Sequence, residues 1–184
     1  KFRDGSDPYG YPNTDWNKEV LLPRAWQQMH SLTASGGSDK VKYFAGFGYV
    51  KQDALYGDTR TNKSTSGFNR YNARVNIDAN IVDKYLNLSA DMAYRQEDRN
   101  SIAGSTSDVF NNMHRNPQTD PGRFPDGNLG KVSLGVNPIG LATEGGWVKD
   151  RKSVLNTRFM LDFNVPGLEG LNLKGIFSYD KIFN

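Results

Sequence analysis

The sequence predicts an all-β chain that forms a segment of a large antiparallel transmembrane β-barrel, with six strands in three hairpins. Two observations favour this fold class. Apolar and polar residues alternate along several stretches, and the connections between these stretches are alternately short and long. The 184 residues contain no apolar run long enough for a membrane-spanning helix, whereas a barrel strand needs to be apolar on only one face. The mean hydropathy of −0.68 is compatible with such a barrel.

The clearest alternation lies near the middle of the chain. One face of this predicted strand is apolar: Tyr71, Ala73, Val75, Ile77, Ala79 and Ile81. The other face is polar: Asn72, Arg74, Asn76, Asp78 and Asn80. Successive side chains of a strand point to opposite sides of the sheet, so the pattern indicates one dry and one wet face. A short turn at residues 82–85 leads to a second alternating strand, which completes a hairpin.

Two further hairpins are expected, one toward each end of the chain. Near the C-terminus, apolar residues from Leu155 to Val165 alternate with polar ones, and a turn rich in Pro and Gly at residues 166–170 leads to the last strand. Near the N-terminus, a strand that starts at Gln27 passes through a turn at residues 36–39. The alternation of the strand that follows this turn is weaker, because Phe44 and Val50 lie on its otherwise polar face.

The connections between the hairpins are long, at residues 52–68 and 97–151. Structureless segments of this length are uncommon in compact domains unless they serve a function. Short turns on one rim and long loops on the other are the arrangement of bacterial outer-membrane barrels. Within the second connection, residues 107–114 are predicted to form a short helix capped by Ser107 or Asp108, and the remainder is expected to be irregular loop.

Six strands are too few for a closed membrane barrel, because the smallest such barrels have about eight. An open sheet edge in lipid would leave backbone groups without partners. We therefore expect further strands before and after this segment. Residues 1–26 are expected to form an extracellular loop before the first strand. Residues 27–184 are expected to form barrel strands with long extracellular loops at 52–68 and 97–151.

Four motifs follow one another along the chain. They are Asn13-Thr14-Asp15-Trp16 with Glu19-Val20; Gln28, His30 and Leu32 with Ser35-Gly36-Gly37; Lys42-Tyr43-Phe44 with Gly48-Tyr49 and Gln52; and residues 70–78, Arg-Tyr-Asn-Ala-Arg-Val-Asn-Ile-Asp. In this order they resemble the motifs of the SusC/RagA family of TonB-dependent outer-membrane transporters. The similarity extends from about Asn13 to Tyr179. Thr33 replaces the usual Ser, and the acidic Asp53 lacks the Gly that usually follows.

This resemblance implies a whole barrel of about 22 strands with a plugged lumen, of which the chain is an early strand segment after the plug. It implies TonB-dependent import of glycan, oligosaccharide or peptide nutrients across the bacterial cell outer membrane. It also implies a SusD-like surface lipoprotein as a lid, with TonB acting through a plug region outside this chain. A nucleic-acid partner is not expected, because the net charge is only +3.

No catalytic group, metal site or cofactor site is expected, so the chain is not predicted to be an enzyme. The sequence has no Cys and only two His, His30 and His114, and both are interpreted as packing or hydrogen-bonding residues. Asp120, Asp126 and Asn128 loosely resemble a calcium loop, but their spacing differs from that of an EF-hand. These three residues are therefore interpreted as turn residues.

Aromatic residues in the loops are the candidates for substrate contact, because recognition residues are concentrated on loops held by a rigid scaffold. These candidates are Trp147, Tyr56 and Trp26. Trp16, within a family motif, is interpreted as a structural or partner-docking loop residue. The residues expected to face the lumen or plug are Arg74, Asn76, Asp78, Asp91 and Arg158. A simpler interpretation is that these five residues only make the water-facing side of the strands polar, without a specific contact.

Two other classes of protein share part of this pattern. A soluble or surface β-sandwich carbohydrate-binding module would bury the apolar face between two sheets. It predicts shorter strands, loops of similar length at both ends, and folding without detergent. A passive porin or structural barrel shares the alternation but lacks a plug, a lid partner and the ordered motifs.

Overall fold

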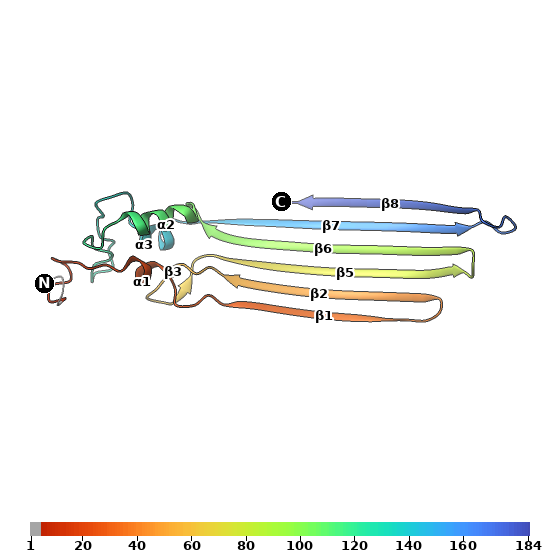
Figure 1. The fold of residues 1–184 in the computed structure, drawn as a ribbon, viewed down its shortest axis with the longest axis horizontal. Helices are drawn as coiled ribbons and strands as arrows, with labels where there is room; N and C mark the ends of the chain where they lie inside the picture. Colours follow the sequence, from red (N-terminus) through yellow and green to blue (C-terminus); the bar gives the residue numbers. More distant parts are fainter. Residues whose placement is uncertain (1–4) are drawn as a thin grey trace. The chain divides into compact units, whose positions relative to one another are not determined.

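The computed structural model describes residues 5–184 and contains a six-stranded sheet in which neighbours in sequence lie side by side (Figure 1). The prediction of a mostly antiparallel all-β chain is confirmed. The sheet order is β1-β2-β5-β6-β7-β8. The strands are β1 (Gln27–Gly37), β2 (Val41–Asp53), β5 (Gly67–Val82), β6 (Leu86–Ile102), β7 (Trp147–Asn164) and β8 (Asn172–Phe183).

The strands extend further than predicted at the ends that join the long connections. β6 has 17 residues and β7 has 18, so the second long connection is residues 103–146 rather than 97–151. The polar stretch after Tyr94 was interpreted as loop, but it continues to pair with β7. Arg151 Nε of β7 donates to Asp98 Oδ1 of β6 at 2.6 Å. A run of polar residues can form a strand in this way where both faces of the sheet are in contact with water.

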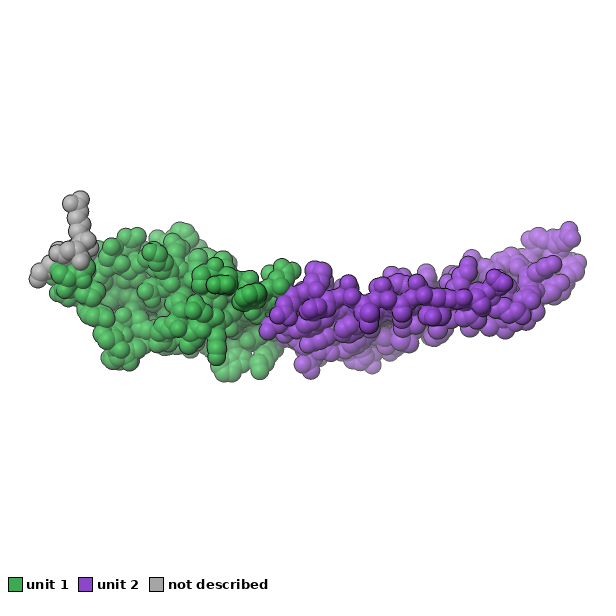
Figure 2. All heavy atoms as spheres, turned by 90° about the horizontal axis from the view of Figure 1, so that it is seen from below, with its two compact units in different colours: residues 1–27, 52–68, 99–149 green, residues 28–51, 69–98, 150–184 purple. Residues whose placement is uncertain are grey.

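The chain divides into two compact units (Figure 2). The sheet unit consists of residues 28–51, 69–98 and 150–184. The loop unit consists of described residues up to 27 together with residues 52–68 and 99–149. The loop unit is therefore assembled from the N-terminal segment and the two long connections, including the strand ends that join them.

The loop unit has its own secondary structure and core, which corrects the expectation of irregular loop. It contains α1 (Trp16–Val20), α2 (Thr106–Arg115) and α3 (Pro138–Thr143), and the short strands β3 (Gly57–Asp58) and β4 (Lys63–Ser64) pair with one another. Its buried core consists of Trp16, Val20, Tyr56, Ile102, Val109, Met113, Ile139 and Ala142. Three segments far apart in sequence thus bury one shared apolar cluster.

The helix termini explain where two of these helices start. α2 confirms the predicted helix, but its cap is Ser105 rather than Ser107 or Asp108: the Ser105 hydroxyl accepts from the Ser107 backbone N–H at 3.1 Å. α3 was not predicted, although its signal is present. Asn137 Oδ1 accepts from the Ile139 backbone N–H at 3.0 Å, and a Pro follows at the first helical position, which is a favoured arrangement. Among residues 5–184 no helix is long and apolar enough to cross a membrane.

Candidate functional site

The apolar face of the sheet unit is uncovered within the described part of the chain. Large side chains on it are between 36% and 62% exposed: Tyr71, Val75, Ile77, Ile81, Phe159, Leu161, Leu173 and Phe177. Phe159 lies opposite Phe177, and Phe163 opposite Leu173, in the register of β7 and β8, so these two pairs share one side of the sheet. The smaller pairs Met160–Ile176 and Val154–Ile182 lie on the other side. Extended exposed apolar patches mark contact with another apolar surface or with a membrane.

A row of aromatic rings crosses the same face near the strand ends that join the long connections. His30 of β1 stacks on Tyr49 of β2, with 6.2 Å between ring centroids and an interplanar angle of 8°. Tyr49 in turn lies 5.0 Å from Tyr71 of β5. Aromatic rings with a polar edge are typical of the boundary between an apolar layer and water.

Toward the end of β6, the same face of the sheet becomes polar. The Tyr94 hydroxyl of β6 donates to Gln96 Oε1 at 3.0 Å and lies 3.3 Å from Ser153 Oγ of β7. Gln96 Nε2 continues the series by donating to Asp98 Oδ2 at 2.9 Å. The face thus changes from an apolar band to a hydrogen-bonded polar zone within one strand.

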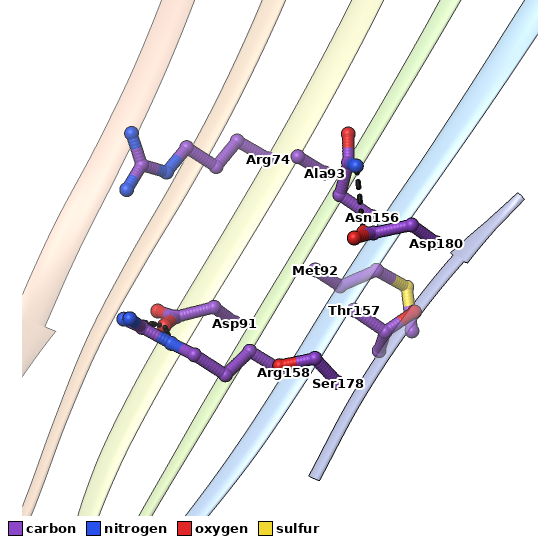
Figure 3. A pocket seen from close by; sticks show the side chains of 9 residues that line it. All are labelled: Arg74, Asp91, Met92, Ala93, Asn156, Thr157, Arg158, Ser178 and Asp180. Carbon is purple, nitrogen blue, oxygen red and sulfur yellow. Dashed lines mark hydrogen bonds and ion pairs between the residues drawn. The ribbon is translucent and has the colours of Figure 1, made fainter. Parts of the chain in front are cut away.

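The opposite, polar face of the sheet unit carries a hydrogen-bond network centred on Asp91, of which Figure 3 shows the contact with Arg158. Arg158 reaches from β7 to this carboxylate on β6, with Nε donating at 2.8 Å and Nη2 forming an ion pair. Asn76 of β5 donates its Nδ2 to the other carboxylate oxygen. Arg74 Nε donates to Asn76 Oδ1 at 2.9 Å. Side chains of three neighbouring strands are therefore joined laterally.

A depression of about 360 Å³ lies over this network and is lined in part by Arg74, Asp91, Asn156, Arg158 and Asp180 (Figure 3). Asn156 Nδ2 donates to Asp180 Oδ1 at 2.7 Å. Two guanidinium groups and two carboxylates leave the depression without net charge. It offers fixed hydrogen-bond donors and acceptors to a polar partner.

Four of the five residues expected to face the lumen or plug come together in the Asp91 network. The fifth, Asp78, lies on the same face but accepts from Ser89 Oγ, at 2.6 Å. Asn156 and Asp180 complete the depression and were not singled out from the sequence. The signal that could have found them was their position on the polar side of the alternation in β7 and β8.

The loop aromatics divide into exposed and buried residues. Trp147 and Trp26 are 68% and 63% exposed, so both retain a surface for binding. Tyr56, expected to contact substrate, is instead only 7% exposed in the core of the loop unit, where its hydroxyl lies 3.2 Å from Thr106 Oγ1. Trp16 is also buried and donates from Nε1 to Pro117 O at 3.2 Å. This contact gives Trp16 a structural role.

The acidic residues of the second long connection act in turns and packing. Asp120 is buried and accepts from both the backbone N–H and the hydroxyl of Ser133, each at 2.6 Å. The backbone N–H of Asn128 lowers the pKa of the Asp126 carboxyl below its ordinary value. His114 Nδ1 lies 2.7 Å from Phe110 O. Within the described chain, no group of three or more His, Cys, Asp or Glu side chains is arranged to hold a metal.

A bidentate ion pair stabilises the short β3–β4 hairpin of the loop unit. Arg60 donates from Nε and Nη2 to the two carboxylate oxygens of Asp58, at 3.1 and 3.2 Å. The hydrogen bond from the Arg60 side chain lowers the pKa of Asp58 below its ordinary value, and it raises the pKa of Arg60. Such fork geometry is among the stronger forms of ion pairing.

No protein-family model matches the chain, and no curated protein matches it.

A double-mutant cycle tests the Asp91 network. Asp91→Ala and Arg158→Ala are expected to show a coupling free energy of about 1 kcal/mol, because the pair combines charge with two hydrogen bonds in a partly exposed position. Lys40 and Asp83 form the control pair: they lie 3.6 Å apart with 70% and 66% of their side chains exposed, and their coupling should be near zero. Chemical unfolding in detergent measures both cycles. Equal coupling in the two pairs would contradict the network.

A pH titration tests the hairpin ion pair. The folded-state pKa of Asp58 lies below its unfolded value, so its contribution to stability is complete above the unfolded value of about 3.9. That contribution is lost as the pH falls from there through the folded-state pKa. Arg60→Gln should raise the pKa of Asp58 and shift this loss to higher pH, as measured by carboxyl NMR. Arg115→Gln, which removes an exposed cation elsewhere, should leave the Asp58 titration unchanged; an equal shift would point to a general charge effect.

Proposed function

We propose that the chain is part of the barrel wall of a TonB-dependent importer of the SusC/RagA type in the bacterial outer membrane. The observation that carries this proposal is the six-stranded sheet with one uncovered apolar face and one hydrogen-bonded polar face. A barrel wall separates lipid from an aqueous lumen and needs these two faces. The four ordered sequence motifs support the choice of family.

The length of the strands supports a bilayer-spanning role. The sheet strands have 11 to 18 residues, whereas a tilted strand crosses the hydrocarbon layer with about 9–11. The surplus residues extend beyond the apolar layer. The ring row of His30, Tyr49 and Tyr71 then lies at the interface, where a ring can be half in lipid and half in water.

The polar face in this proposal lines the lumen or contacts the plug. Several of its charged groups satisfy one another across the strands, as Asp91 does with Arg158, whereas Asn80 Oδ1 on this face is buried without a hydrogen-bond partner. The depression beside this pair presents donors and acceptors to a plug segment or to a passing solute. The transported nutrient is a glycan, an oligosaccharide or a peptide.

The loop unit in this proposal is extracellular and contributes to nutrient capture beneath a SusD-like lipoprotein lid. Its apolar core makes the two long connections a structured unit, which supports recognition by fixed groups. The exposed rings of Trp26 and Trp147 are its candidates for contact with the nutrient or the lid. TonB acts through a plug region that this chain does not contain.

The β-sandwich alternative fits the observations less well. It requires a second sheet against the apolar face, and within residues 5–184 the other sheet has two strands of two residues each. It also predicts loops of similar length at both ends, whereas the connections within the hairpins are short and the two between them are long.

A pair of charge insertions tests whether the apolar face meets lipid. Ile77→Arg on this face is expected to cost about 2–4 kcal/mol near the bilayer midplane, and it should lower the amount of protein assembled in the outer membrane and its TonB-dependent nutrient uptake. Asn87→Arg, on the polar face of the next strand, is the matched control and should change neither quantity. Membrane fractionation and uptake with and without TonB measure the effects.

Two outcomes would contradict the proposal. If both variants assemble and transport as well as the unmodified protein, the apolar face does not contact lipid. If uptake is the same with and without TonB, the protein is a passive barrel instead of an energised importer.

A further inference from the structure

The loop unit contains an open groove of about 390 Å³, lined by both polar and apolar side chains, that is distinct from the depression on the sheet. It is formed by the end of β2, the start of β5, the end of β6 and residues next to them in the chain. Its lining includes Gln52, Asp53, Ser66, Phe68, Arg99 and Asn100. Its volume lies within the range of about 300–1,000 Å³ that small-molecule sites occupy.

Two buried polar atoms of the groove residues have no hydrogen-bond partner. They are Ser66 Oγ and Asn100 Oδ1. Ser66 is only 7% exposed. The amide of Asn100 is oriented by its Nδ2, which donates to Thr65 O at 3.0 Å, so Oδ1 remains as a fixed acceptor. Buried polar atoms without partners disfavour folding, and each such atom in a native protein calls for an explanation.

Three longer side chains of the groove are also unengaged. Among residues 5–184, the side chains of Gln52, Asp53 and Arg99 form no hydrogen bond or ion pair. Asp53 supplies two acceptor oxygens, Arg99 supplies a fork of donors, and Gln52 supplies both kinds of group. The opposite charges of Asp53 and Arg99 leave the groove without net charge, which disfavours a strongly charged ligand.

We propose that this groove binds a short neutral saccharide. A sugar hydroxyl both donates and accepts, so neighbouring hydroxyl groups match the unengaged carboxylate of Asp53, guanidinium of Arg99 and amide of Gln52. The half-buried ring of Phe68 offers an electron-rich face to sugar C–H groups. The inference deepens the proposed function and rests on it, since it selects saccharide over peptide as the nutrient recognised by the loop unit.

A peptide fits the groove less well. Extended peptides are commonly bound by pairing with a free strand edge. The strands β2, β5 and β6 that contribute to the groove each have a neighbour on both sides, so they offer no free edge. The groove also lacks an excess of one charge for a charged peptide terminus.

Calorimetric titration of the purified protein in detergent tests the proposal. The probes are maltotriose, cellotriose and mannotriose, with tetraglycine as the peptide probe. At least one trisaccharide should bind the unmodified protein. Its affinity should fall about tenfold or more in Asp53→Ala and in Arg99→Ala, because each loses hydrogen bonds made by a charged group. These side chains form no internal bonds, so the variants should fold, and a thermal melt checks this.

The control variant is Asp39→Ala, which removes an exposed carboxylate in the turn between β1 and β2. It should bind the trisaccharide as the unmodified protein does. Binding of tetraglycine alone, binding of no probe, or equal saccharide affinity in all variants would overturn the inference. TonB-dependent uptake of a peptide would then leave the proposed function standing. Saccharide binding in the groove without any TonB-dependent uptake would instead overturn the proposed function.

Discussion

The backbone hydrogen bonding of the six-stranded sheet is the constraint on which the other features depend. The inner strands β2, β5, β6 and β7 each pair on both sides, and a paired strand must send successive side chains to opposite faces. Because the sequence alternates with the same period, pairing brings most of the apolar residues onto one face and most of the polar residues onto the other. Within residues 5–184 neither face is covered by a second large sheet, so the two faces are suited to two different surroundings.

The two units engage most of their polar groups internally, but each leaves some buried side-chain oxygens without a partner, including Asn80 Oδ1 in the sheet unit. On the wet face of the sheet, Asp91, Asn76 and Arg158 satisfy one another laterally. Partly exposed pairs of this kind contribute little to stability, so their main effect is to hold side chains in place. The loop unit buries a compact apolar core, yet leaves Ser66 Oγ and Asn100 Oδ1 without partners. A rigid scaffold with unused polar groups is the arrangement expected of a recognition site.

Much of the sheet could be predicted from the sequence, because alternation is a local signal. Residues 71–81 identify a strand and its two faces without any knowledge of the neighbours. The loop core could not be predicted in this way: Trp16 and Ile139 are far apart in the chain, and α3 has only six residues. For the Asp91 network, the sequence predicts only the face of the sheet on which each residue lies. Alternation places Asp91 and Arg158 on polar sides, but their pairing depends on strand register, as does the groove around Asp53 and Arg99.

Accessibility along β5 in native outer membranes tests the central claim most directly. The 184 residues contain no Cys, so single Cys substitutions at successive positions from 71 to 80 can carry a spin label without a background from this chain. Collision with oxygen, which dissolves in lipid, and with a water-soluble nickel reagent reports the surroundings of each label. The account predicts that odd positions respond to oxygen and even positions to the nickel reagent. Nickel access at every position, or no alternation, would contradict a sheet that separates lipid from water.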